Sequence, residues 1–317
     1  MKLFYIILYN FIIGTLCLIF GVNTMSGGLE KINPTAIRKT LSRFTGSIPS
    51  ALLTGTVLTA LVQSSTAVTV TAVGLVNSGL MTLAQSIGII YGANIGTTIT
   101  TQLMSLRITD TALPLLAAGF LIKILSKKSS FRYIGHAIIG FGFMFLGLGI
   151  LNSGVPYLKE SKQAYELFRV YGENPIIGIV IGMLTTMLVH SSSATVGITI
   201  VLFNSHLISF NAALCLTLGD NIGTCITAQI ASIGTSVSAR RTAWAHTLYN
   251  VIGVLIALVL LHPFSNIVQY LTTVLGQSET RLVANAHTIF NVISAVLFLP
   301  FTKLYVRFIE WIVPEKK

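Results

Sequence analysis

The segment LVQSSTAV at Leu61–Val68 places four consecutive polar residues between apolar neighbours, and LVHSSSAT at Leu188–Thr195 repeats this pattern. Each copy is followed by a second motif, GANIGTT at Gly92–Thr98 or GDNIGTC at Gly219–Cys225. Hydroxyl, amide and carboxylate groups are costly to bury unless they have partners or a ligand. These paired motifs therefore decide both the expected fold and the expected site.

The composition predicts an integral membrane protein. Hydrophobic residues make up 53% of the 317 residues, only 9% are charged, and the mean hydropathy is +0.81. A soluble domain carries about 25% charged residues, and here apolar runs long enough to cross a bilayer recur along the chain. The net charge of +11 does not indicate a nucleic-acid partner, because the basic residues lie in short loops between apolar runs. The expected partner is the lipid bilayer, and no organic cofactor is expected.

A shift of 127 residues aligns the two halves of the chain. It superposes Gly55 on Gly182, Ser64 on Ser191 and Asn94 on Asn221. Internal repetition of this length indicates a duplicated structural unit. We predict a first unit at 1–127 and a second at 128–262, followed by an extra transmembrane helix and cytoplasmic tail at 263–317.

Segment lengths predict two special elements within each unit. Residues 48–76 are too many for one membrane span of about 20 residues and too few for two. We expect a re-entrant helical hairpin with Gln63–Thr66 at its tip, repeated at 174–203. Residues 82–106 and 209–232 are expected to cross as helices broken at their NIGT motifs, since irregular backbone at membrane depth is tolerated where it lines a cavity. Ordinary single spans are expected at 3–22, 112–126, 133–152, 242–262 and 284–304.

The distribution of basic residues predicts the topology. If both hairpins return to their side of entry, each unit crosses the membrane three times and the second unit is inverted. One face then receives Lys31, Arg38, Lys39, Arg43, Lys127, Lys128, Arg132, Arg240, Arg241, Arg307, Lys316 and Lys317. The other receives Lys2, Arg107, Lys159, Lys162, Arg169 and Arg281. The positive-inside rule then places the N-terminus outside and the C-terminus in the cytoplasm. Inverted repeats with discontinuous helices indicate a secondary transporter.

The polar motifs suit a small anion and a hard cation. A hairpin tip exposes helix termini whose N–H groups favour an anion, and the serine and threonine hydroxyls add further donors. Hydroxyl and carbonyl oxygens are also ligands that suit Na⁺. Asp220 is the one carboxylate inside a repeated motif, and Ala93 occupies its position in the first copy. This asymmetry makes Asp220 the strongest candidate cation ligand.

Structural explanations compete with these roles. Serine and threonine in membrane helices often bond to the carbonyl four residues earlier. Asp220 could be a hydrogen-bond partner only, and His190, which replaces Gln63, could be a polar contact or a proton carrier. His246 with Asn250, and His287 with Asn291, share one face of their helices. These pairs either bond between helices or line a substrate route.

Paired QSSS-like tetrads, each followed by a G-x-N-I-G-T motif, resemble the type II sodium–phosphate cotransporter family in its bacterial branch. The resemblance implies Na⁺-coupled symport of inorganic phosphate into the cell by alternating access, across the bacterial inner membrane. Two departures are the threonine that ends QSST and the histidine that begins HSSS. The candidate phosphate-binding residues are Gln63, Ser64, Ser65, Thr66, His190, Ser191, Ser192, Ser193, Asn94 and Asn221. The candidate Na⁺ ligands are Asp220, Thr97, Thr98, Thr100, Thr224 and Thr227.

Three other functions remain open from the sequence. A Na⁺ symporter for another small anion or solute would use the same features, and so would a passive channel or a phosphate-sensing membrane protein. An intramembrane serine hydrolase built from Ser191–Ser193, His190 and Asp220 is disfavoured. The repeat duplicates the serines without duplicating the histidine or the aspartate, so an enzyme is not expected.

Overall fold

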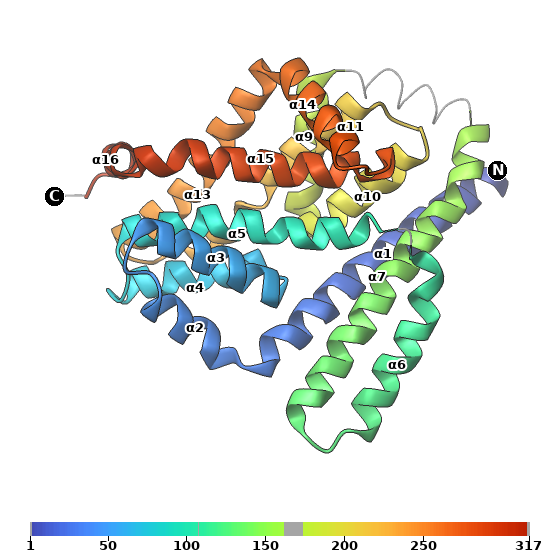
Figure 1. The fold of residues 1–317 in the computed structure, drawn as a ribbon, viewed down its shortest axis with the longest axis horizontal. Coiled ribbons are helices and arrows are strands. Elements are labelled where there is room, and N and C mark those ends of the chain that lie inside the picture. The colour runs from blue at the N-terminus through green and yellow to red at the C-terminus, as the bar shows by residue number, and fades with distance from the viewer. Residues whose placement is uncertain (1, 107, 162–173, 316–317) are drawn as a thin grey trace. The chain divides into compact units, whose positions relative to one another are not determined.

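The computed structural model describes residues 2–106, 108–161 and 174–315, and every regular element in these ranges is helical (Figure 1). Contacts divide the chain into two compact units. The first unit comprises Met1–Ile32, Thr101–Gly223 and Leu260–His287, and the second comprises Asn33–Thr100, Thr224–Val259 and Thr288–Lys317. Each unit therefore combines segments from both halves of the sequence.

Four helical stretches within the described residues are long and apolar enough to cross a membrane. They are Tyr5–Ile32, Ser129–Glu160, Val237–Val259 and Glu279–Ile312, and α5 (Leu83–Met104) with the short α6 (Ala112–Leu125) would make a fifth. The predicted all-α class with several membrane spans is confirmed. The predicted span at 112–126 is α6 alone, which at 14 residues is shorter than a span requires.

In the first unit, α1 (Lys2–Ile32) lies side by side with α7 (Ser129–Glu160), and α6 packs on α7 (Figure 1). Glycines allow the close approach of α1 and α7. A Cβ atom on Gly21 would lie 2.3 Å from the backbone nitrogen of Met144. Small residues at this contact thus allow tight backbone packing, as is typical between membrane helices.

The first unit also contains the second polar tetrad. Its remaining elements are η1 (Thr109–Thr111), α9 (Pro175–Val189), α10 (Ser192–Asn204), α11 (Phe210–Gly223), α14 (Leu261–Val274), η2 (Glu279–Arg281) and the first turns of α15 (Leu282–Phe298). Leu18, Phe145, Leu148, Val196 and Ile200 belong to one buried core cluster. The helix that begins at the tetrad is therefore held against α1 and α7 by apolar contacts.

The second unit contains the first polar tetrad. Its elements are α2 (Pro34–Arg43), α3 (Ile48–Val62), α4 (Ser65–Asn77), most of α5, α12 (Ile226–Ala231), α13 (Val237–Val259), the rest of α15, η3 (Leu299–Phe301) and α16 (Thr302–Ile312). Tyr91, Tyr249 and Tyr305 are buried in one cluster that joins α5, α13 and α16. The hydroxyl of Tyr305 donates to the carbonyl of Ala245 at 2.7 Å.

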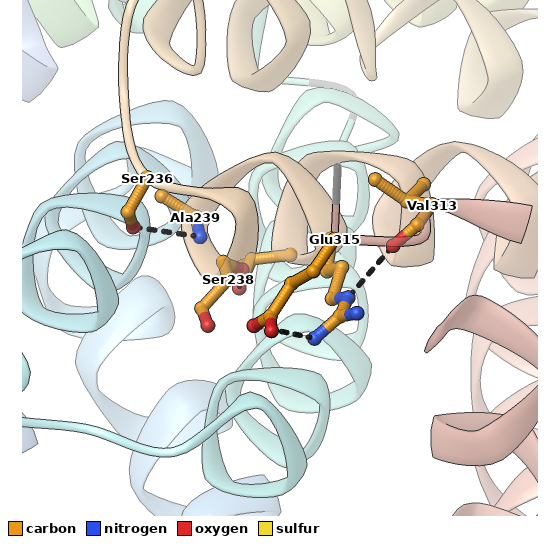
Figure 2. A network of polar contacts seen from close by, with 7 residues as sticks. Ser236, Ser238, Ala239, Val313 and Glu315 are labelled. Carbon is orange, nitrogen blue, oxygen red and sulfur yellow. Dashed lines mark hydrogen bonds and ion pairs between the residues drawn. The ribbon is translucent and has the colours of Figure 1, made fainter. Parts of the chain in front are cut away.

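Polar contacts fasten the beginning of α13 in the second unit. Ser236 accepts a hydrogen bond from the backbone N–H of Ala239 at 3.3 Å, and its own N–H donates to Asn77 at the end of α4. Figure 2 shows this start of α13 beside the segment after α16. There Arg241 Nε donates to the Val313 carbonyl at 2.9 Å, and Arg241 Nη1 lies 3.8 Å from the carboxylate of Glu315.

The prediction of a broken helix at 82–106 is wrong. Helix α5 runs without interruption through Asn94–Thr98. Its glycines allow close packing against α3 instead. A Cβ atom on Gly92 would lie 2.0 Å from the carbonyl oxygen of Leu52, and a Cβ atom on Gly96 would lie 2.6 Å from the carbonyl oxygen of Thr56. In the second copy the helix is interrupted as predicted, because α11 ends at Gly223 and α12 begins at Ile226.

Candidate functional site

Each polar tetrad lies at a turn between two short apolar helices, and the two turns have the same backbone geometry. Gln63 ends α3 with φ 57° and ψ 31°, and His190 ends α9 with φ 53° and ψ 26°. The following serines, Ser64 and Ser191, are extended, with φ −146° in both and ψ 95° and 101°. Positive φ is uncommon outside glycine. The same strained turn therefore forms twice, at positions 127 residues apart.

The serine after each turn caps the helix that follows. Ser64 Oγ accepts from the N–H of Ala67 at 3.1 Å, and Ser191 Oγ accepts from the N–H of Ala194 at 3.3 Å. A hydroxyl that accepts a backbone hydrogen bond keeps its own proton to donate. The first backbone N–H groups of α4 and α10 also have no acceptor within their own helix. Each tip thus presents donors suited to an anion.

In the second unit, α5 contacts the first tetrad through Thr100. The Thr100 hydroxyl donates to Gln63 Oε1 at 2.7 Å. Asn94, which is buried on the same helix, donates from Nδ2 to Asn250 Oδ1 on α13 at 3.0 Å. Asn250 thus bonds between helices, which is one of the two roles considered for the His246–Asn250 pair, whereas both ring nitrogens of His246 are buried without a hydrogen-bond partner among the described residues.

Three of the other threonines predicted as Na⁺ ligands donate to backbone carbonyls three or four residues earlier. Thr97 donates to the Ala93 carbonyl at 2.9 Å, Thr98 to that of Ile95 at 2.7 Å, and Thr227 to that of Thr224 at 3.1 Å. Because α5 is continuous, the free carbonyls expected at Asn94–Thr98 are not formed. Thr224 lies where α11 has ended and α12 has not begun.

In the first unit, three helices converge on Asp220. Its side chain is fully buried on α11, and its Oδ1 lies 2.7 Å from Thr186 Oγ1 on α9. Thr186 Oγ1 is also 2.9 Å from Thr195 Oγ1 on α10. Thr186 donates to the carboxylate, and the Thr195 hydroxyl donates to the Ser191 carbonyl one turn earlier at 3.3 Å. Thr186 and Thr195 were not predicted from the sequence.

The sequence did contain a signal for this cluster. The 127-residue shift aligns Thr186 with Thr59, Thr195 with Val68, and Asp220 with Ala93. The second copy thus differs from the first at two of three positions, and both changes add oxygen ligands. In the first copy, the buried hydroxyl of Thr59 has no hydrogen-bond partner among the described residues.

Two remaining predicted residues lie close to this cluster in the chain. Asn221 is buried and donates from Nδ2 to the Thr217 carbonyl of its own helix at 2.8 Å. His190 is exposed at the turn.

The second His–Asn pair is His287 with Asn291. His287 Nδ1 lies 2.9 Å from Thr101 Oγ1, which confirms a bond between helices there.

The predicted site residues therefore fall into two groups. The second unit holds Gln63, Ser64, Ser65, Thr66, Asn94, Thr97, Thr98, Thr100, Thr224 and Thr227. The first unit holds His190, Ser191, Ser192, Ser193, Asp220 and Asn221. Each group contains one Ser-capped turn, and the carboxylate belongs to one of them alone.

A family model described as Na⁺/Pi-cotransporter matches residues 17–153 and 159–277 of this chain. The chain belongs to the Na⁺/Pi-cotransporter family. It is thus a multi-pass membrane protein of a transporter family and not an enzyme.

Relatives of this Na⁺/Pi-cotransporter family member come from bacteria and animals. The uncharacterized protein YqeW of Bacillus subtilis is 32% identical over 98% of this chain and 100% of its own length. YjbB of Salmonella typhimurium, whose name proposes inorganic phosphate export, is 27% identical over 94% of this chain and 54% of its own length. Human sodium-dependent phosphate transport protein 2B is 32% identical over 58% of this chain and 28% of its own length. The chain thus spans about half the length of YjbB, and no solved structure matches it.

Proposed function

We propose that this protein transports inorganic phosphate across the membrane, coupled to Na⁺, by alternating access. The observation that carries the proposal is the Ser-capped turn built twice in one chain, with a buried carboxylate beside one copy only. Membership of the Na⁺/Pi-cotransporter family supports both solutes. In this proposal Na⁺ is the coupling ion.

Both tetrads are phosphate-binding elements in this proposal. Each supplies serine hydroxyls and helix N–H groups, which donate to the acceptor oxygens of phosphate. The proposed repeats are 1–127 and 128–262, with the second inverted. Matching close contacts support the duplication: a Cβ on Gly92 would meet the Leu52 carbonyl at 2.0 Å, and one on Gly219 would meet that of Ile179 at 2.0 Å. The loop charges support the inversion. In a bacterial inner membrane they place the N-terminus outside the cell and the C-terminus in the cytoplasm.

Asp220 is the proposed centre of the Na⁺ site. Carboxylate and hydroxyl oxygens are the ligands that hard cations take. Thr186 brings a hydroxyl to the fully buried carboxylate, and the Thr195 hydroxyl lies 2.9 Å from that of Thr186. A buried ionisable residue in a membrane helix marks a functional site by default. No group of three or more His, Cys, Asp or Glu that could hold a metal exists among the described residues. One carboxylate with neutral oxygens fits a monovalent cation.

Phosphate export without Na⁺ coupling is a second candidate, because YjbB is named for export. The two candidates differ in their driving force. An inward Na⁺ gradient drives accumulation by a symporter, whereas an uncoupled exporter only dissipates a phosphate gradient.

Purified protein in liposomes distinguishes these functions. We expect labelled phosphate to accumulate above its external concentration under an inward Na⁺ gradient and not under a K⁺ gradient. Equal downhill flux with and without Na⁺ would favour the uncoupled exporter. If arsenate or sulfate competes better than phosphate, the substrate is another oxyanion. No phosphate flux under any gradient would overturn the proposal.

A further inference from the structure

Arg281 is a half-buried cation of the first unit that is not part of either tetrad group. It ends η2, and its Nη2 donates to Gln102 Oε1 at 2.8 Å. Its Nε is buried without a hydrogen-bond partner among the described residues. The ion pair between Arg241 and Glu315 is the only one found in the described part of the chain, so Arg281 has no carboxylate partner there.

A relay of neutral amides holds Gln102 in place. Gln102 Nε2 donates to Asn285 Oδ1 at 3.1 Å, and Asn285 Nδ2 donates to Gln277 Oε1 at 2.7 Å and to Thr272 Oγ1 at 2.9 Å. Asn285 and Thr272 are buried, with 7% and 3% of their surface exposed. These bonds fix which end of the Gln102 amide faces Arg281. Within the described residues, the network therefore orients the guanidinium through neutral groups only.

An oriented guanidinium without a counter-ion suits an anionic ligand. Removing charge from water is costly unless an opposite charge or strong hydrogen bonds compensate it, and a buried N–H without an acceptor adds to that cost. The guanidinium fork matches the oxygens of a phosphate group and is weakly hydrated. A phosphate oxygen would satisfy Nε and neutralise the charge in one step.

We propose that Arg281 and Gln102 form an accessory binding station for a phosphate oxyanion, outside the tetrads. The ligand is either inorganic phosphate or the phosphate of a phospholipid headgroup. The loop charges predict that Arg281 lies on the external face, from which imported phosphate would enter. The role of this station in transport rests on the proposed function, whereas anion binding by Arg281 does not.

Cysteine protection measures binding without transport. Ser278 is exposed and directly precedes η2, so Ser278→Cys in a variant lacking the three native cysteines can be labelled by a charged thiol reagent. In lipid-free detergent, we expect inorganic phosphate to slow labelling by about tenfold, and chloride at equal ionic strength to have no effect. Protection should disappear with Arg281→Gln. It should persist when Ser65→Ala and Ser192→Ala remove tetrad hydroxyls, which separates this station from the main site.

The same assay distinguishes the two sources of phosphate. Protection by inorganic phosphate supports a station for the free ion. Protection by short-chain phosphatidylglycerol alone supports a lipid headgroup site. If neither ligand protects, or if protection survives Arg281→Gln, the proposal is overturned.

Transport kinetics then test the role of the station. Arg281→Gln should raise the KM for external phosphate by about tenfold while the rate at saturating phosphate and the Na⁺ dependence stay near the parent values. Arg281→Lys keeps the charge but loses the fork, so it should give an intermediate KM. Should the Gln variant instead lower the melting temperature and maximal rate with an unchanged KM, Arg281 is only structural and its transport role fails.

Discussion

The hydroxyl of Thr186 lies 2.7 Å from the carboxylate of Asp220. The first copy has Thr59 and Ala93 at the corresponding positions, so it keeps the hydroxyl and lacks the carboxylate. Helix α5 forms with alanine at this position, so the carboxylate is not needed for that helix. The proposed Na⁺ site at Asp220 would account for the asymmetry between the two copies.

Asp220→Asn should weaken the apparent Na⁺ affinity by at least about tenfold, which corresponds to about 1.4 kcal/mol. The asparagine keeps the size and one oxygen but removes the charge that attracts the cation. Phosphate affinity at saturating Na⁺ should change much less, since the Na⁺ site can then still be filled. Titrating uptake against Na⁺ at fixed phosphate, and then the reverse, measures both. An unchanged Na⁺ curve with a collapsed phosphate curve would move Asp220 out of the cation site.

Threonine-to-valine substitutions at equivalent positions form a matched pair. Thr186→Val removes the hydroxyl that contacts Asp220 and should weaken the apparent Na⁺ affinity. Thr59→Val removes a buried hydroxyl without a partner among the described residues, so it should be neutral or stabilising by up to about 1 kcal/mol. Na⁺ titration and thermal unfolding of both variants check this. Equal effects on Na⁺ affinity would mean that the Thr186–Asp220 contact has no special role.

Ser65→Ala and Ser192→Ala should each reduce phosphate affinity severely while expression stays intact. Neither serine caps its helix, since Ser64 and Ser191 do so, and the helices should therefore form in both variants. Loss of one hydrogen bond to a charged ligand costs about 1.5–3 kcal/mol, or roughly 10- to 150-fold in affinity. Phosphate-dependent uptake provides the measurement, and Ser78→Ala at the far end of α4 is the control. Parental phosphate affinity in both tetrad variants would place the substrate site elsewhere.

Gly21→Ala should destabilise the first unit. The added methyl carbon would lie 2.3 Å from the Met144 backbone nitrogen, so α1 and α7 would have to separate. Overpacking of this kind costs about 1–3 kcal/mol. Gly27→Ala on the same helix is the control, because nothing lies within 4 Å of the position that its added methyl carbon would take. Melting temperatures in detergent should fall for Gly21→Ala and not for Gly27→Ala; equal values would show that the close approach is dispensable.

The orientation of α7 tests the predicted topology. Lys128 precedes this helix of 32 residues and Lys159 lies in its last turn, while Lys162 and Arg169 lie outside the described residues. A cysteine at position 159 should react with an impermeant reagent added to intact cells, and one at position 128 should react only after the membrane is opened. Reaction of both from the outside, or of position 128 alone, would contradict the inverted arrangement.

The sequence is enough to predict the class of protein and the place of its polar turns. Apolar run lengths predict the membrane helices, and the breaks at Gln63–Ser64 and His190–Ser191 fall inside the predicted tetrads. These features depend on local composition and short-range backbone preferences, which a single sequence contains.

Packing decides what the sequence left open. A glycine in a membrane helix can either interrupt it or allow another helix to approach, and Gly92 and Gly96 do the second because α3 lies against them. Thr186, Thr195 and Asp220 meet because three helices converge, and Gln102 meets Arg281 across 179 positions of sequence. Such contacts depend on which helix faces pack together, and that choice depends on the whole set of buried surfaces rather than on any one segment.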